Sequence, residues 1–147
     1  PLPVYGDGSN VRDWLYVLDH CAAVRTVLER GRLGETYNIG GNSERRNIEV
    51  VGAICDLVDE LRPGAGGESC RRLIAFVDDR PGHDLRYAMN CDKLRALGWR
   101  RDYTFDSALE ATVNWFKENE WWWRKIKTGD YLDFYKRQYE SRLAAAE

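Results

Sequence analysis

The sequence predicts an α/β fold with a few short strands and three to four helices. Short extended segments alternate with segments whose apolar residues recur at helical spacing. Only one or two complete strand–helix units occur in 147 residues, too few for a complete doubly wound sheet. We therefore expect one compact domain over residues 1–147 that belongs to a larger fold.

Two short strands are expected at the start of the chain. Residues 1–5 form an extended segment that ends at the turn residues 6–10. Residues 11–17 begin with alternating apolar and polar side chains, which predicts the second strand. A third compact strand is predicted over residues 36–39, directly before Gly40-Gly41.

The first two helices are expected on either side of that third strand. Asp19 is placed to cap the first, which Gly31 ends and which carries Cys21, Val24 and Leu28 at helical spacing. Asn47 is placed to cap the second. Its apolar stripe consists of Val50, Val51, Ile54, Leu57, Val58 and Leu61.

The second half of the chain repeats the alternation. The Gly-rich residues 62–72 predict a surface loop, and residues 73–77 predict a buried strand that runs into a polar segment. A short helix is expected over residues 92–97, closed by Gly98. Asp106 is placed to cap a long amphipathic helix, and residues 121–139 continue as helical or irregular chain rich in Trp and Tyr.

Charge and composition argue against several classes of partner. Lys and Arg total 22 against 24 Asp and Glu, so electrostatics favours neither nucleic acid nor a membrane surface. No apolar run approaches the ~20 residues of a membrane span and no signal-peptide pattern is present, which predicts a cytoplasmic protein. The chain starts at Pro1 and has its only methionine at Met89, so we expect a fragment of a longer protein.

The four cysteines do not predict a metal site. They are scattered without a CxxC pair, and the sequence has only two histidines. We expect reduced thiols, two or three of them buried, and no bound metal.

The segment Asp79-Arg80-Pro81-Gly82-His83-Asp84-Leu85-Arg86-Tyr87 is the most informative motif. A Pro-Gly turn directly after a buried strand predicts a rigid loop that carries Arg80, His83 and Arg86. Arginine offers a planar fork of donors that suits a diphosphate, and histidine adds another donor. A solvated turn with surface ion pairs explains the same residues.

Two further residues have both a structural and a functional interpretation. Arg12 could bind phosphate or form a surface ion pair with Asp13 or Asp7. Asn47 could act only as a helix cap, although a helix N-terminus is also an anion site.

Motifs for hydride chemistry are missing from the sequence. Two segments start like the dinucleotide-binding motif GxGxxG, one at Gly6 and one at Gly64. Each lacks the third glycine: Val11 takes that position in the first segment, and Ser69 in the second. No tyrosine is followed by lysine four positions later. The adjacent carboxylates Asp78 and Asp79 are not expected to do acid–base work, and Trp121-Trp122-Trp123 favours packing over base stacking.

Taken together, these segments resemble the dTDP-glucose 4,6-dehydratases of the extended short-chain dehydrogenase/reductase superfamily. Tyr37-Asn38-Ile39-Gly40-Gly41 is common across extended members, whereas Asp79-Arg80-Pro81-Gly82-His83-Asp84 is more specific to the dehydratases. The resemblance covers residues 1–8, 11–17, 19–20, 34–41, 47, 79–87, 97–99, 121–122 and 129–131.

The resemblance implies the carboxyl-terminal, substrate-binding domain of an extended short-chain dehydrogenase/reductase fold, without most of the Rossmann sheet. It implies that Pro3 and Tyr5 line the nucleotide pocket. It also implies that a dTDP-sugar is held through its nucleotide and diphosphate by Arg12, Asn47, Arg80 and His83.

The resemblance also implies which parts of the reaction this chain lacks. Full-length members use NAD to take hydride from sugar C4 and return it to C6, while a base removes the C5 proton and water leaves from C6. The NAD loop and the catalytic residues belong to the amino-terminal half. We therefore expect no catalytic residue and no bound cofactor here, only weak dTDP-sugar binding and no turnover by the chain alone.

A non-enzymatic module is the alternative function. Such a truncated product would fold as an oligomer or bind a protein partner. In either case a strand at residues 36–39 that lacks its neighbours, together with apolar helix faces, predicts a homo-oligomer, most simply a dimer.

Overall fold

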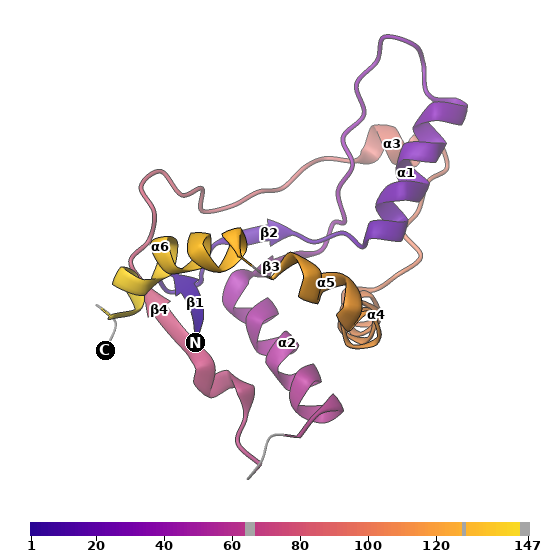
Figure 1. The fold of residues 1–147 in the computed structure, drawn as a ribbon. Helices are drawn as coiled ribbons and strands as arrows, with labels where there is room; N and C mark the ends of the chain where they lie inside the picture. Colours follow the sequence, from indigo (N-terminus) through magenta and orange to yellow (C-terminus); the bar gives the residue numbers. More distant parts are fainter. Residues whose placement is uncertain (64–66, 128, 145–147) are drawn as a thin grey trace. The chain divides into compact units, whose positions relative to one another are not determined.

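The computed structural model describes residues 1–63, 67–127 and 129–144. The chain divides into two compact units (Figure 1). The first unit consists of Pro1–Ser9, Asn47–His83 and Glu110–Glu147, and the second of Asn10–Arg46 and Asp84–Leu109. Within the loop expected over residues 62–72, residues 64–66 lie outside the described residues.

The first unit contains a parallel pair of strands. β1 (Leu2–Tyr5) pairs with β4 (Ile74–Val77), with Leu2 opposite Ile74 and Tyr5 opposite Val77. Val4 and Val77 are buried, with exposed fractions of 6% and 4%. The two extended segments predicted from the sequence are thereby confirmed. The helix α6 (Asp130–Ala144) lies against β4 (Figure 1).

The turn after β1 is packed on the start of α2 (Asn47–Leu61). Gly8 has a φ of +72°, and its carbonyl oxygen accepts a hydrogen bond from the Ile48 N–H at 3.0 Å. A Cβ at Gly8 would lie 2.8 Å from the Cβ of Ile48. Glycine is therefore required here for its backbone conformation and for this close approach.

The segment that leads into β4 is tied to α2 by charged side chains. It contains a short 3₁₀ helix, η1 (Cys70–Leu73), in which the Arg71 guanidinium donates two hydrogen bonds of 2.6 Å to the Asp56 carboxylate. Asp59 accepts hydrogen bonds from the Ser69 hydroxyl and from the Cys70 N–H. These contacts fix the entry of β4 relative to the helix.

Three helices make up the last part of the chain: α4 (Phe105–Glu118), α5 (Glu120–Ile126) and α6. Asp106 was expected to cap α4, but Thr104 does so. The Ser107 N–H donates to Thr104 Oγ1 at 3.2 Å, and the Thr104 N–H donates to Ser107 Oγ at 3.1 Å. This reciprocal pair satisfies two backbone donors, and Asp106 lies inside the first turn.

The second unit contains an antiparallel strand pair and two helices. β2 (Val11–Asp13) pairs with β3 (Glu44–Arg46), and the helices are α1 (Val17–Arg30) and α3 (Asp92–Ala96). Its core is small. It consists of the buried Ala23, Leu94 and Trp99, against which Leu15, Ala22, Val27 and Ile39 pack.

The prediction that Asp19 caps α1 is wrong. Tyr16 holds the cap position, and Asp19 is only 2% exposed inside the first turn. Its carboxylate accepts hydrogen bonds from the Asp102 N–H at 2.8 Å and the Tyr103 N–H at 3.3 Å. Leu28, expected on the buried face, is 81% exposed because α1 turns Ala23 toward the core.

The strand predicted over residues 36–39 does not form. The side chains around it contact loops: the Arg32 N–H donates to Tyr37 Oη at 2.9 Å, and Lys93 Nζ donates to the Thr36 carbonyl at 2.8 Å. A strand needs a neighbouring strand for its backbone donors and acceptors, and in the described residues none pairs with this segment. None of the described helices is both long and apolar enough to span a membrane.

Candidate functional site

The ends of β1 and β4 bring two loops to one edge of the first unit. Because the strands are parallel, their last residues, Tyr5 and Val77, are neighbours. The Gly6 N–H donates to the Val77 carbonyl at 2.9 Å, which holds the exits together. In α/β proteins this edge is where ligands bind.

The loop after β4 is held in one conformation by its own side chains. Gly82 has a φ of +70°, and the His83 N–H donates to the Arg80 carbonyl at 3.3 Å, closing the Pro-Gly turn. His83 Nδ1 lies 2.6 Å from Asp79 Oδ1, which also accepts the Arg80 N–H at 2.8 Å. The hydrogen bond with His83 is the main reason that the pKa of Asp79 is lowered. The loop is therefore preorganised before any ligand arrives.

Tyr5 joins this loop to the carboxyl-terminal helix. Its ring meets the His83 imidazole edge to face, with centroids 6.0 Å apart. Its hydroxyl accepts a hydrogen bond from Gln138 Nε2 at 3.3 Å. This bond is the largest cause of the lowered pKa of Tyr5, and the positive charges of Arg142 and Arg80 act in the same direction.

Residues of α6 complete the cluster, and sequence reasoning did not identify them. The centroid of the Tyr139 ring lies 6.2 Å from that of the Tyr5 ring, and the Arg142 guanidinium lies over the Tyr5 ring, 5.2 Å from its centroid. Arg142 Nη1 is buried and has no hydrogen-bond partner among the described residues. Gln138 and Arg142 are four residues apart and share one helix face, which is the signal that the sequence offered.

The remaining predicted residues of the first unit lie on elements that surround the cluster. Pro3 precedes Tyr5 by two residues in β1, so both side chains point to one face of the strand pair. Asn47 is the first residue of α2, where the helix dipole favours an anion, although the next backbone N–H, that of Ile48, is already bonded to the Gly8 carbonyl. Among the six predicted residues, contacts join Tyr5, Arg80 and His83 most directly.

Arg12 belongs to the second unit, where its guanidinium is held by the end of the Asp79–Tyr87 motif. It donates to the Asp84 carbonyl at 3.0 Å and lies 4.3 Å from the centroid of the Tyr87 ring. Arg86 forms two hydrogen bonds with the Glu44 carboxylate, at 2.7 and 2.8 Å. Arg86 therefore ties this segment to β3 and is not available as a third cation for a diphosphate.

The first-unit cluster suits an anionic ligand that carries an aromatic ring. The Arg80 guanidinium is exposed and has no polar partner among the described residues, and the imidazole of His83 lies in the same loop. Tyr5 and Tyr139 offer ring surfaces. In the described part of the chain, no three His, Cys, Asp or Glu residues are placed to hold a metal ion.

Comparison with known proteins identifies the family. The model of the GDP-mannose 4,6 dehydratase family matches residues 1–112. The chain belongs to this family. Within the GDP-mannose 4,6 dehydratase family, it is 57% identical over 132 residues to the dTDP-glucose 4,6-dehydratase of Xanthomonas campestris pv. campestris (strain B100), covering 89% of this chain and 38% of that protein. It is 49% identical over 142 residues to dTDP-glucose 4,6-dehydratase 1 of Escherichia coli K12, a match that covers 96% of this chain and 39% of that protein.

Solved structures agree with this assignment. The dTDP-glucose 4,6-dehydratase of Bacillus anthracis in complex with NAD is 48% identical, has a TM-score of 0.73, and matches 85% of this chain and 37% of that one. The dTDP-glucose 4,6-dehydratase from Streptomyces venezuelae, also with NAD bound, is 43% identical and has a TM-score of 0.73. The match covers 86% of this chain and 37% of that one. The resemblance to the dTDP-glucose 4,6-dehydratases and the predicted partial fold of the extended short-chain dehydrogenase/reductase superfamily are confirmed. The chain spans about 38% of the length of the curated relatives it matches.

Proposed function

We propose that this chain is the nucleotide-sugar-binding part of a dTDP-glucose 4,6-dehydratase and performs no turnover alone. The observation that carries the proposal is the cluster of Tyr5, Arg80 and His83 at the carboxyl edge of β1 and β4. A preorganised loop with a free guanidinium suits a diphosphate, and the adjacent tyrosine rings suit a nucleotide base.

The individual roles follow from the chemistry of each side chain. Arg80 and His83 would donate to the diphosphate, while Pro3 and Tyr5 would line the nucleotide pocket. Asn47 would contribute at the N-terminus of α2. The role of Arg12, which lies in the second unit, rests on the resemblance alone and stays a prediction. Arg142, whose buried Nη1 has no hydrogen-bond partner within the described ranges, would be a further donor for the same ligand.

NAD is not expected to bind to this chain, although the solved relatives hold it. In the described part of the chain, the turn after a parallel strand that most resembles a phosphate loop is Gly6-Asp7-Gly8. Ile48 and Val4 already occupy the space around Gly8, so the backbone there offers no cradle for a pyrophosphate. The described residues therefore do not fit the cofactor.

Binding of dTDP tests the proposed site. We expect the isolated chain to bind dTDP weakly, with a Kd in the millimolar range, which corresponds to a binding free energy of ~4 kcal/mol. Binding can be measured by NMR shifts or by calorimetry. The variant Arg80→Ala should abolish the signal because so weak a complex should not survive the loss of the loop's exposed fork of donors. Arg80→Lys should restore only part of it, since lysine keeps the charge and loses the planar geometry.

Arg72→Ala is the matched control. Arg72 is exposed and paired with Glu68 at 2.9 Å, away from the cluster. The control should bind dTDP as the parent chain does. An undiminished signal in Arg80→Ala would remove Arg80 from the site, and UDP binding as tightly as dTDP would contradict selectivity for the thymine nucleotide.

A non-enzymatic oligomeric module is the second candidate, and apolar exposure favours it. Trp121 and Trp122 are 61% and 43% exposed, and no third strand of the described residues pairs with either edge of the β1–β4 pair. Residues 36–39 no longer support this argument, because they form no strand. We still expect a dimer at micromolar concentration, measured by light scattering after size exclusion. Trp121→Glu should shift it toward monomer; a parent chain that is already monomeric would contradict the prediction.

A further inference from the structure

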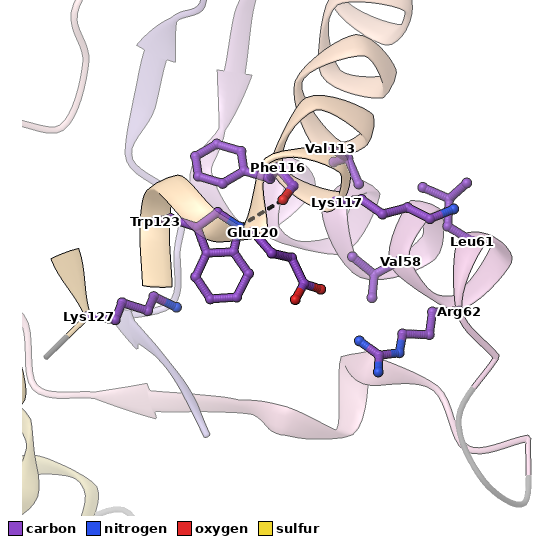
Figure 2. A pocket seen from close by; sticks show the side chains of 9 residues that line it. All are labelled: Val58, Leu61, Arg62, Val113, Phe116, Lys117, Glu120, Trp123 and Lys127. Atoms are coloured by element: carbon purple, nitrogen blue, oxygen red, sulfur yellow. Dashed lines mark hydrogen bonds between the residues drawn. The ribbon is translucent and has the colours of Figure 1, made fainter. Parts of the chain in front are cut away.

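A pocket of about 680 Å³ opens in the first unit between α2, α4 and α5 (Figure 2). Each helix contributes residues three to four positions apart, so one face of every helix turns toward the same space. Its volume is in the ordinary range for small-molecule sites. None of the residues that line it belongs to the cluster around Tyr5.

The walls of the pocket are apolar. Val58 and Leu61 come from α2, and Val113 and Phe116 come from α4. Phe116 remains 46% exposed, and no described residue of α4 is fully buried. The apolar face of α4 is therefore covered only in part by its neighbours.

Trp123 forms the third wall and is held in place. Its Nε1 donates to the Phe116 carbonyl at 2.7 Å, the dashed line in Figure 2. Lys127 Nζ lies 5.1 Å from the centroid of the indole ring. The Arg124 guanidinium also lies over this ring, 5.5 Å from its centroid. The fixed indole therefore offers an aromatic wall, flanked by cations, that an apolar ligand can contact without ordering the side chain first.

Positive charge surrounds the pocket. Arg62, Lys117 and Lys127 all line it, and no ion pair to any of them occurs in the described part of the chain. The one lining carboxylate, Glu120, is neutralised by Arg124, which donates to it at 2.8 and 3.0 Å. Unpaired cations around an apolar, aromatic space attract an anion with an apolar body.

We propose that this pocket binds an amphipathic anion: a flat apolar body of one or two rings with a single carboxylate or sulfonate group. The rings would lie between Trp123 and the aliphatic wall of Val58 and Val113. The acidic group would face Arg62 and Lys117. This site is separate from the proposed nucleotide site and does not depend on it.

Titration with naphthalene-2-sulfonate, followed by methyl NMR, tests the location. The methyl signals of Val58, Leu61 and Val113 should shift saturably, and those of the buried Val4 should not. The neutral 2-naphthalenemethanol should bind more weakly because it cannot use the cations. Shifts spread over the whole chain, or equal affinity for the neutral compound, would overturn the proposal.

Charge removal tests the recognition. The double variant Arg62→Met, Lys117→Met should weaken binding of naphthalene-2-sulfonate by about three- to tenfold, while leaving affinity for the neutral compound unchanged. Lys136→Met, which removes an exposed lysine of α6, is the control and should bind as the parent chain does. An unaltered affinity in the double variant would show that the cations do not select the ligand.

Discussion

No 4-keto-6-deoxy sugar nucleotide should form when the purified chain is incubated with NAD and dTDP-glucose. The dehydratase reaction needs a hydride carrier and a base, and this sequence has neither a GxGxxG loop nor a Tyr-x-x-x-Lys pair. Enzymes of ordinary efficiency accelerate reactions by at least about 10⁶-fold, so the loss should be complete on the scale of the assay.

Product can be measured by NMR of the sugar nucleotide after overnight incubation. The full-length Xanthomonas campestris relative, assayed at the same concentration, is the positive control. Adding the chain to that enzyme should not raise its rate. Product above a blank without protein would contradict the assignment of this chain as a binding part only, whereas failed dTDP binding would contradict the site itself.

Local patterns in the sequence were sufficient for the elements that hold the loop of the candidate site. The apolar run at residues 73–77 predicts β4, and the stripe from Val50 to Leu61 predicts α2. The Pro-Gly turn then predicts a rigid loop with Arg80 and His83. The strand, the helix and the turn form as predicted because each is specified by residues close together in the chain.

The contribution of α6 could not be predicted in the same way. Tyr5 and Gln138 are 133 positions apart, and nothing local in either segment indicates that they meet. Residues 36–39 fail for the opposite reason. Their local pattern favours a strand, but strand formation depends on a partner that the described residues do not supply.

Leu94→Ala should destabilise the second unit more than any other single truncation of an aliphatic side chain within it. Leu94 is fully buried between Ala23 and Trp99, in a core with few other members. Truncating a buried leucine costs about 2–5 kcal/mol through lost burial and the cavity that remains. That is a large share of the ~5–15 kcal/mol that stabilises an ordinary domain.

Urea unfolding followed by far-ultraviolet circular dichroism measures this effect, and Leu33→Ala provides the control. Leu33 is in the same unit but 102% exposed, so its truncation should change the free energy of unfolding by no more than about 0.5 kcal/mol. Trp99 Nε1 also donates to the Asp19 carbonyl of α1 at 3.2 Å, so loosening the core should weaken the attachment of α1 to the rest of the unit as well. Equal unfolding midpoints for the two variants would mean that Leu94 does not hold this unit together, and the small core would have to be assigned elsewhere.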